Sequence, residues 1–416
     1  MKVTSRDLIE VFGRIGLLSF GGPAAQIALM HRELVERRNW LDEQIFLRAL
    51  SLCMMLPGPE AMQLATYAGW RLRGVPGGLI AGTLFILPGA VVIAGLFAVY
   101  VTLGIQPLVQ AAFLGIKAAV IVIVLQALRN LARKALTSKT AWVMAGMSFT
   151  AIYVLDLPFP LIIATAALWG FARTPTVEEP SDQVSQVAAT PFRTVVTWLP
   201  LWLGPLAALK LLGPDILAET GWFFAKLAVV TFGGAYAVLA YMTQTVVQDY
   251  GWITTAQMID ALGLAETTPG PLILVTQFVA MLAGYGTGGL PLAFAAGCVA
   301  LWATFVPCFL WIFLSAPYLE RISANARLEA ALKGITAAVV GVILNLSIWF
   351  ALHVLFGNLV EATLGPVKLS VPDISQLDLK ALILTLAAVI LLIWFKRSLG
   401  FTLFLLALAG MALYLV

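Results

Sequence analysis

Charged residues are scarce in this sequence. Only 11% of the 416 residues are Asp, Glu, Lys or Arg, and 61% are apolar. A soluble globular chain carries about 25% charged and about 45–50% apolar residues, so this composition excludes a soluble domain. Apolar runs such as 79–103 and 381–395 approach or reach the roughly 20 residues that cross a bilayer as a helix. The sequence therefore predicts an all-α polytopic membrane protein.

Residues that support metal or covalent chemistry are also scarce. The chain has three cysteines and two histidines, and neither set has the spacing of metal ligands. It contains no HExxH, GxSxG or P-loop motif. The net charge of +4 comes without a dense basic patch, so it indicates the inner-leaflet bias of a membrane protein. We predict no metal, no cofactor and no nucleic-acid partner, and a membrane-embedded enzyme remains an alternative.

The chain repeats itself. One alignment register superposes the FGG motif at 20–22 on that at 232–234 and the PGP motif at 57–59 on that at 269–271, and it pairs Gly74 with Gly286. After an insertion in the second copy, a second register pairs Pro88 with Pro307. Two registers, each held over unusual residues, indicate duplication. The predicted organisation is a first repeat at 1–173, a polar cytoplasmic linker at 174–193, and a connecting transmembrane helix with the second repeat at 194–416.

The connecting segments exchange charge between the two copies. The basic segments of the first copy are 31–38, 71–73 and 129–139, and their equivalents in the second copy are nearly free of Lys and Arg. The reverse holds at 320–333, which is basic, whereas its equivalent at 101–114 has no charge. Because short basic loops stay in the cytoplasm, the exchange predicts inverted topology for the second copy. The apolar segment 194–213 supplies the odd crossing, and the N-terminus is expected in the cytoplasm.

Glycine and proline interrupt apolar stretches that are otherwise helical. The arms beside the two motifs of the first copy are 7–19, 24–31, 42–56 and 60–70. They span roughly 12–22 Å, less than the ~30 Å hydrocarbon core. We therefore predict two broken, re-entrant helical hairpins in each copy, with the FGG and PGP motifs at their tips. Whether the arms stop at the midplane or cross obliquely stays open, and glycines that only allow close helix packing are the alternative.

Helices that restart after these tips favour an anion site. Free N–H groups and positive dipole ends of such helices attract negative charge, and paired repeats with broken helices are typical of secondary transporters. Hydroxyls of Ser19, Thr231, Thr267 and Thr268 are expected either to bind the anion or to cap helices. The candidate substrate-binding residues are Ser19, Phe20, Gly21, Gly22, Pro23, Pro57, Gly58, Pro59, Thr231, Phe232, Gly233, Gly234, Thr268, Pro269, Gly270 and Pro271, with the intramembrane cations Arg14, Lys117 and Lys226.

Two carboxylates flank the PGP motifs. Glu60 follows the first motif, and Glu266 precedes the second. A carboxylate beside an anion site is a candidate for proton coupling when burial raises its proton affinity. A carboxylate neutralised by Arg or Lys is the alternative interpretation.

The motifs together resemble the chromate transporter family. The resemblance rests on GLLSFGGP at 16–23, on MHRELVERRNW at 30–40 with LPGP at 56–59, and on TFGGAY at 231–236 with TTPGP at 267–271. It covers nearly the whole chain and matches the long, two-domain form of the family. At position 235 the second copy has Ala where the first has Pro, so the tips are not fully symmetric.

The resemblance implies a function. It implies export of chromate from the bacterial cytoplasm across the inner membrane, energised by the proton-motive force and giving chromate resistance. It also implies that the matching FGG and PGP positions form the site. Sulfate or another tetrahedral oxyanion as substrate, a passive anion channel, and assembly as a homodimer stay open.

Overall fold

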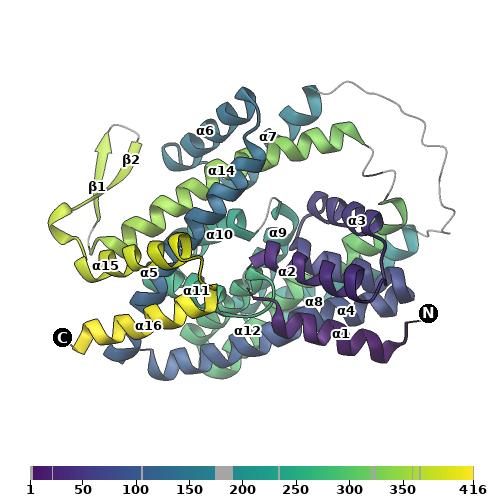
Figure 1. The fold of residues 1–416 in the computed structure, drawn as a ribbon, viewed down its shortest axis with the longest axis horizontal. Coiled ribbons are helices and arrows are strands. Elements are labelled where there is room, and N and C mark those ends of the chain that lie inside the picture. The colour runs from purple at the N-terminus through teal and green to yellow at the C-terminus, as the bar shows by residue number, and fades with distance from the viewer. Residues whose placement is uncertain are drawn as a thin grey trace. The chain divides into compact units, whose positions relative to one another are not determined.

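The computed structural model describes residues 3–20, 22–104, 106–173, 191–232, 235–319, 322, 325–357, 359–364 and 367–415. This part of the chain is almost wholly helical (Figure 1). Five helical segments are long and apolar enough to cross a membrane: Glu60–Leu103, Pro107–Ala135, Pro191–Leu212, Leu272–Tyr318 and Ala326–Leu355. The prediction of an all-α polytopic membrane protein is therefore confirmed.

The chain forms two compact units, and each unit contains parts of both repeats. Unit 1 comprises 1–97, 171–238 and 268–332, and unit 2 comprises 98–170, 239–267 and 333–416. The units therefore do not coincide with the repeats that the sequence predicts. The repeat boundaries stay a prediction, and most of the predicted linker, 174–190, lies outside the described residues.

Unit 1 holds most of the motif-bearing helices. Its elements are α1 (Ser5–Leu18), α2 (Gly22–His31), η1 (Arg32–Arg37), α3 (Glu43–Met55), most of α4 (Glu60–Leu103), α8 (Pro191–Leu212), α9 (Asp215–Val230), the start of α10 (Ala235–Thr243), η3 (Leu272–Leu274), α12 (Val275–Ser315) and η4 (Ala316–Tyr318). Local chemistry sets the helix starts, since Thr4 caps α1 through a reciprocal contact with Asp7 and the Asp42 carboxylate caps α3.

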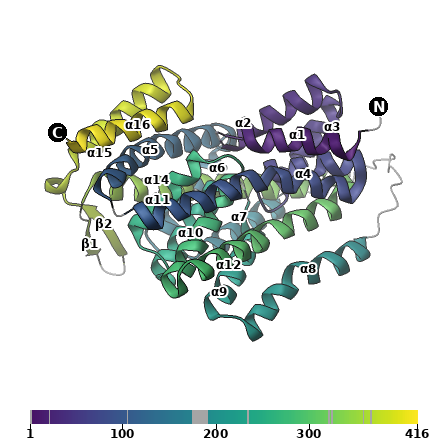
Figure 2. The ribbon, with the colours of Figure 1, turned by 90° about the horizontal axis from the view of Figure 1, so that it is seen from below.

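Unit 2 contains the remaining helices and a β-hairpin. Its elements are α5 (Pro107–Ala135), α6 (Lys139–Tyr153), most of α7 (Phe159–Arg173), the end of α10, η2 (Gln244–Asp249), α11 (Thr255–Thr267), most of α14 (Ala326–Leu355), β1 (Leu359–Leu364), β2 (Val367–Pro372), η5 (Ile374–Gln376), α15 (Leu379–Val389), η6 (Ile390–Trp394) and α16 (Leu399–Leu415). Figure 2 shows α15 and α16 beside α5, and glycines allow the closest crossing, because Gly115 faces the Leu406 carbonyl and Gly410 the Ala111 carbonyl.

The antiparallel pair β1–β2, with Leu359 opposite Pro372, was not predicted. Its sequence, LVEATL followed by VKLSVP, is too short and too apolar to stand out from the neighbouring membrane helices. Its β-branched residues are the one signal that favoured strands. The hairpin adds a small sheet to a fold that is otherwise helical.

The arms of the predicted hairpins are helices of the expected length. α1 and α2 meet at the first FGG motif, and α3 ends at Met55 just before the first PGP motif. Their 10 to 14 residues correspond to roughly 15–21 Å of helix. The segments 31–38 and 243–250, expected as loops, instead contain π-helical turns, η1 and η2, which occupy equivalent positions in the two repeats.

Both long helices α4 and α12 contain a sharp reversal. Arg73 and Gly74 leave helical geometry in α4, and Gly288 and Gly289 do so in α12 with closely similar angles. The chain folds back there, because the helix before the reversal in α4 packs on the helix after it, Gly69 against Gly77. Only glycine adopts the φ of 64° at Gly74 and 71° at Gly289 with little strain.

The reversals correct one detail of the repeat alignment. The sequence register paired Gly74 with Gly286, whereas the residue of α12 that has the geometry of Gly74 is Gly289. That pairing is therefore wrong, and part of the insertion in the second copy precedes the reversal.

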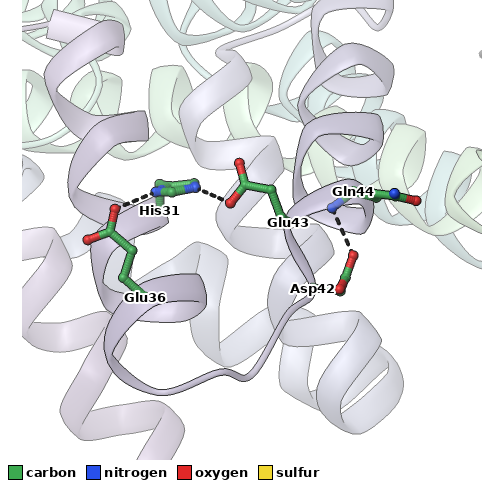
Figure 3. Close-up of polar contacts among 5 residues, drawn as sticks. All are labelled: His31, Glu36, Asp42, Glu43 and Gln44. Carbon is green, nitrogen blue, oxygen red and sulfur yellow. Dashed lines mark hydrogen bonds and ion pairs between the residues drawn. The ribbon is translucent and has the colours of Figure 1, made fainter.

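His31, the last residue of α2, contacts carboxylates on both η1 and α3. His31 Nδ1 lies 3.1 Å from Glu36 Oε1, and His31 Nε2 lies 2.7 Å from Glu43 Oε2 (Figure 3). The hydrogen bond to Glu43, and then the charges of the two carboxylates, raise the pKa of His31, whereas desolvation opposes the rise. His31 lies outside the five candidate spans.

This contact is expected to stabilise the fold only at low pH. Because the pKa is raised on folding, the stabilisation is fully present below about pH 6.5 and disappears as the pH rises through the folded pKa. His31→Gln should therefore lower the free energy of unfolding at pH 5.5 by no more than about 1 kcal/mol, since both glutamates are exposed. Thermal unfolding of the purified protein at pH 5.5 and pH 8.5 measures this, and an equal loss at both values would contradict the assignment.

Candidate functional site

The four motif tips pair with one another in unit 1. The backbone N–H of Gly58 donates to the carbonyl of Thr231 at 2.8 Å, and the N–H of Gly270 donates to the carbonyl of Ser19 at 2.9 Å. The two hydrogen bonds are equivalent, because the register that aligns the FGG motifs also pairs Gly58 with Gly270 and Ser19 with Thr231. Each PGP tip is therefore bonded to the FGG tip of the other repeat.

The FGG tips have the same local geometry. Ser19 and Thr231 are the C-cap residues of α1 and α9, with φ/ψ of −79°/64° and −78°/90°. The N–H of Phe20 then donates to the Leu18 carbonyl, and the N–H of Phe232 to the Val230 carbonyl. These are tight three-residue turns. They aim the Ser19 and Thr231 carbonyls out of their helices and toward the PGP tips.

The tip hydroxyls donate back to their own helices. Ser19 Oγ donates to the Ile15 carbonyl, Thr231 Oγ1 to the Leu227 carbonyl, both at 2.6 Å, and Thr267 Oγ1 to the Leu264 carbonyl at 2.7 Å. In this conformation the three hydroxyls therefore satisfy carbonyls at helix ends. Their role in anion binding stays a prediction.

The PGP tips are enclosed and precede new helices. Gly58 is buried, and so is the whole segment 268–275. The φ values of 123° at Gly58 and 88° at Gly270 turn the backbone sharply. α4 then starts at Glu60 and η3 at Leu272, and the first N–H groups of a helix have no carbonyl partner within it. Their dipoles favour an anion at the paired tips.

Buried glutamines brace the tips, and the sequence reasoning missed them. Gln26 Nε2 donates to the carbonyls of Gly270 at 2.7 Å and Ser19 at 3.3 Å. Gln63 Nε2 donates to the Pro57 carbonyl at 2.7 Å. The second copy has Val238 where the first has Gln26, so this brace is not duplicated. The sequence signal that could have identified Gln26 is a single amide side chain inside the apolar helix α2.

Two of the three predicted cations have exposed side chains. Arg14 on α1 and Lys226 on α9 are both exposed. The structure does not enclose either side chain with the tips, and their role in the site stays a prediction. Lys117 belongs to unit 2, where its Nζ lies 2.7 Å from Asp260 Oδ1. The sequence reasoning did not select Asp260.

The two predicted coupling carboxylates adjoin the PGP tips along the chain. Glu60 is half-buried at the first position of α4, and Glu266 is 7% exposed near the end of α11. Among the other tip residues, Phe20 is 48% exposed, and Gly22, Pro23, Pro57, Pro59 and Phe232 are half-buried. Gly21, Gly233 and Gly234 lie outside the described residues.

Long apolar helices, helical arms too short to span a bilayer, and four backbone breaks paired in one unit are together typical of membrane transporters. The chain belongs to the chromate transporter family, whose model matches residues 6–171 and 218–414. The resemblance read from the FGG and PGP motifs is thereby confirmed.

Individual relatives agree with this membership. The chain is 33% identical over 343 residues to a chromate transport protein of Cupriavidus metallidurans, covering 82% of this chain and 81% of that protein. It is 32% identical to a probable chromate transport protein of Synechococcus elongatus, covering 81% and 82%. It is 33% identical to a chromate transport protein of Pseudomonas aeruginosa, covering 81% and 79%. No solved structure matches the chain.

Proposed function

We propose that this protein transports chromate across the bacterial inner membrane, out of the cytoplasm, driven by the proton-motive force. The observation that carries the proposal is the reciprocal pairing of Gly58 with Thr231 and of Gly270 with Ser19. It supports a single binding site built from all four tips. The relatives whose names state chromate transport supply the substrate class, and resistance to chromate is the expected phenotype.

The chemistry of the tips suits a small oxyanion. Helix starts at Glu60 and Leu272 offer backbone N–H donors, which bind oxygen atoms without requiring a fixed positive charge. A site built from N–H groups binds the dianion through partial charges instead of a full positive charge. That property suits a transporter, which must bind its substrate on one side and release it on the other.

Coupling to protons is assigned first to the carboxylates that adjoin the tips. Glu60 and Glu266 stand next to the PGP motifs on the chain, so a proton on either one reduces the negative charge that faces an arriving dianion. An N-terminus in the cytoplasm and inverted repeats complete the proposed topology.

Chromate flux into everted membrane vesicles tests the proposal. We expect saturable uptake that requires an energised membrane and stops when a protonophore is added. Sulfate in excess should compete weakly if the site prefers chromate, and strongly if it accepts any tetrahedral dianion. Absence of saturable chromate uptake refutes the proposed function, and uptake that a protonophore leaves unchanged favours a passive channel.

A further inference from the structure

A polar cluster centred on a buried carboxylate lies in unit 2, outside the paired tips. The Asp260 carboxylate on α11 is the centre of the cluster. Its Oδ1 lies 2.7 Å from Lys117 Nζ on α5, and its Oδ2 accepts a hydrogen bond of 2.8 Å from the Tyr100 hydroxyl near the end of α4. Asp260 is 9% exposed. One carboxylate thus connects three helices from different parts of the chain.

The cluster is set into a close helix–helix contact. α11 packs on α5, and one turn beyond Asp260 a Cβ atom added at Gly263 would lie 3.1 Å from Ile116 Cγ2, closer than an ordinary van der Waals contact. Both α5 and the end of α4 belong to candidate membrane spans. An ionisable pair in such a place is costly, because desolvation of both charges offsets much of their attraction. A purely structural contact at this position is better made by apolar side chains.

The cluster joins residues of both repeats, and it has no counterpart at the equivalent positions of the repeat alignment. In the repeat alignment, Asp260 is paired with Arg48 in the first register, and Lys117 is paired with Thr336 in the second. A contact required to hold the duplicated scaffold together would be expected twice. A single copy indicates a task that the whole protein performs once per cycle.

The charge of this cluster depends on one proton. The titratable groups that face Asp260 in the described part of the chain are Lys117 from α5 and Tyr100 from α4. With Asp260 ionised, the Lys117–Asp260 pair has no net charge. A proton on Oδ1 leaves the Lys117 ammonium unpaired inside unit 2, while the Tyr100 hydrogen bond to Oδ2 can persist. Protonation of Asp260 therefore changes the electrostatic attraction between α5 and α11.

We propose that Asp260 is a second proton-binding group of the transport cycle, which coupling requires in addition to a carboxylate beside the tips, with Lys117 as its counter-ion and Tyr100 as a positioning residue. The inference rests on the proposed function and adds to it a coupling site in unit 2, distinct from the carboxylates beside the tips. A proton binds Asp260 from one aqueous side and leaves to the other, so no further reactant is needed.

The test uses the full chain in proteoliposomes, with chromate as the probe and the membrane potential clamped at zero. An imposed pH gradient should change the initial chromate flux of the wild type at least about fivefold, the lower range of coupling between two sites. In Asp260→Asn the same gradient should change the flux by less than about twofold, because a proton-binding carboxylate that coupling requires is gone. Asp260→Glu, which keeps a carboxylate, should restore the response.

Controls keep the outcomes separable. The single variant Asp260→Asn leaves the Lys117 ammonium unpaired, which can prevent folding. In that case the double variant Lys117→Gln/Asp260→Asn, which removes both charges, is tested in its place. A folded variant without the carboxylate that still responds to the gradient like the wild type overturns the inference. A wild type whose chromate flux ignores the gradient overturns proton coupling but leaves chromate transport standing. A wild type with no chromate flux overturns the proposed function itself.

Discussion

Replacing Gly89 by Ala should reduce chromate flux about tenfold or more, which corresponds to about 1.4 kcal/mol. Gly89 lies in α4, where a Cβ atom would overlap the Pro269 carbonyl oxygen and lie 2.5 Å from Leu274 Cδ1. Overpacking of this kind costs typically ~1–3 kcal/mol. Because the added methyl meets backbone rather than the end of a flexible side chain, the second PGP tip has to shift relative to α4. Its hydrogen bond from Gly270 to Ser19 is then weakened.

Gly95→Ala is the matched control for this substitution. Gly95 lies in the same helix, and no atom lies within 4 Å of the position of an added Cβ. Its flux should equal that of the wild type, and its melting temperature should be unchanged or slightly higher, because alanine favours the helix. Flux measured in vesicles at equal protein content compares the two. Equal flux in Gly89→Ala and Gly95→Ala would show that the position of the Pro269 tip does not matter for transport.

Replacing Gln26 by Leu should also reduce chromate flux about tenfold or more. The amide of Gln26 is 1% exposed and donates to the carbonyls of Ser19 and Gly270, one from each crossing tip. Leucine has a similar volume but no donor. Each buried carbonyl that loses its partner costs about 1–3 kcal/mol. The loss falls on the two tips that the proposed site requires.

Gln44→Leu serves as the control for Gln26→Leu. Gln44 is exposed at the start of α3, where its backbone N–H, not its side chain, contacts Asp42 (Figure 3). Its flux should stay at the wild-type level. If Gln26→Leu retains both wild-type flux and wild-type thermal stability, the hydrogen bonds from Gln26 to Ser19 and Gly270 are not needed for transport, and the paired-tip site is contradicted.

Local sequence determined the breaks themselves. The Gly and Pro residues of SFGGP and LPGPE force helices to end and restart, because proline lacks an N–H and glycine adopts positive φ. The helix ends at Leu18 and Met55 accordingly fall beside the motifs, where the sequence predicted them. The equivalent of Gly74 was misplaced at Gly286 instead of Gly289, because several glycines lie close together there and local chemistry does not choose among them.

The partners of buried polar groups were beyond the reach of the sequence. Lys117 was selected as a charge within an apolar helix, but its partner Asp260 lies far along the chain, on a helix of the other repeat. Gln26 was not among the predicted site residues, and only its distance to Gly270 reveals its role. Hydrogen-bond pairing over such separations depends on how helices pack, and periodicity in one segment carries no information about it.

The sequence by itself determined that this is a helical membrane protein of the chromate transporter family with a duplicated set of broken helices. Composition, repeat register and motif chemistry are properties of the chain read in order, so they need no coordinates. The tertiary structure decided that each PGP tip bonds the FGG tip of the other repeat, and that the compact units cut across the repeats. These facts depend on which backbone groups meet after packing. A buried N–H takes the carbonyl that the packed helices bring within reach, wherever that carbonyl stands in the sequence.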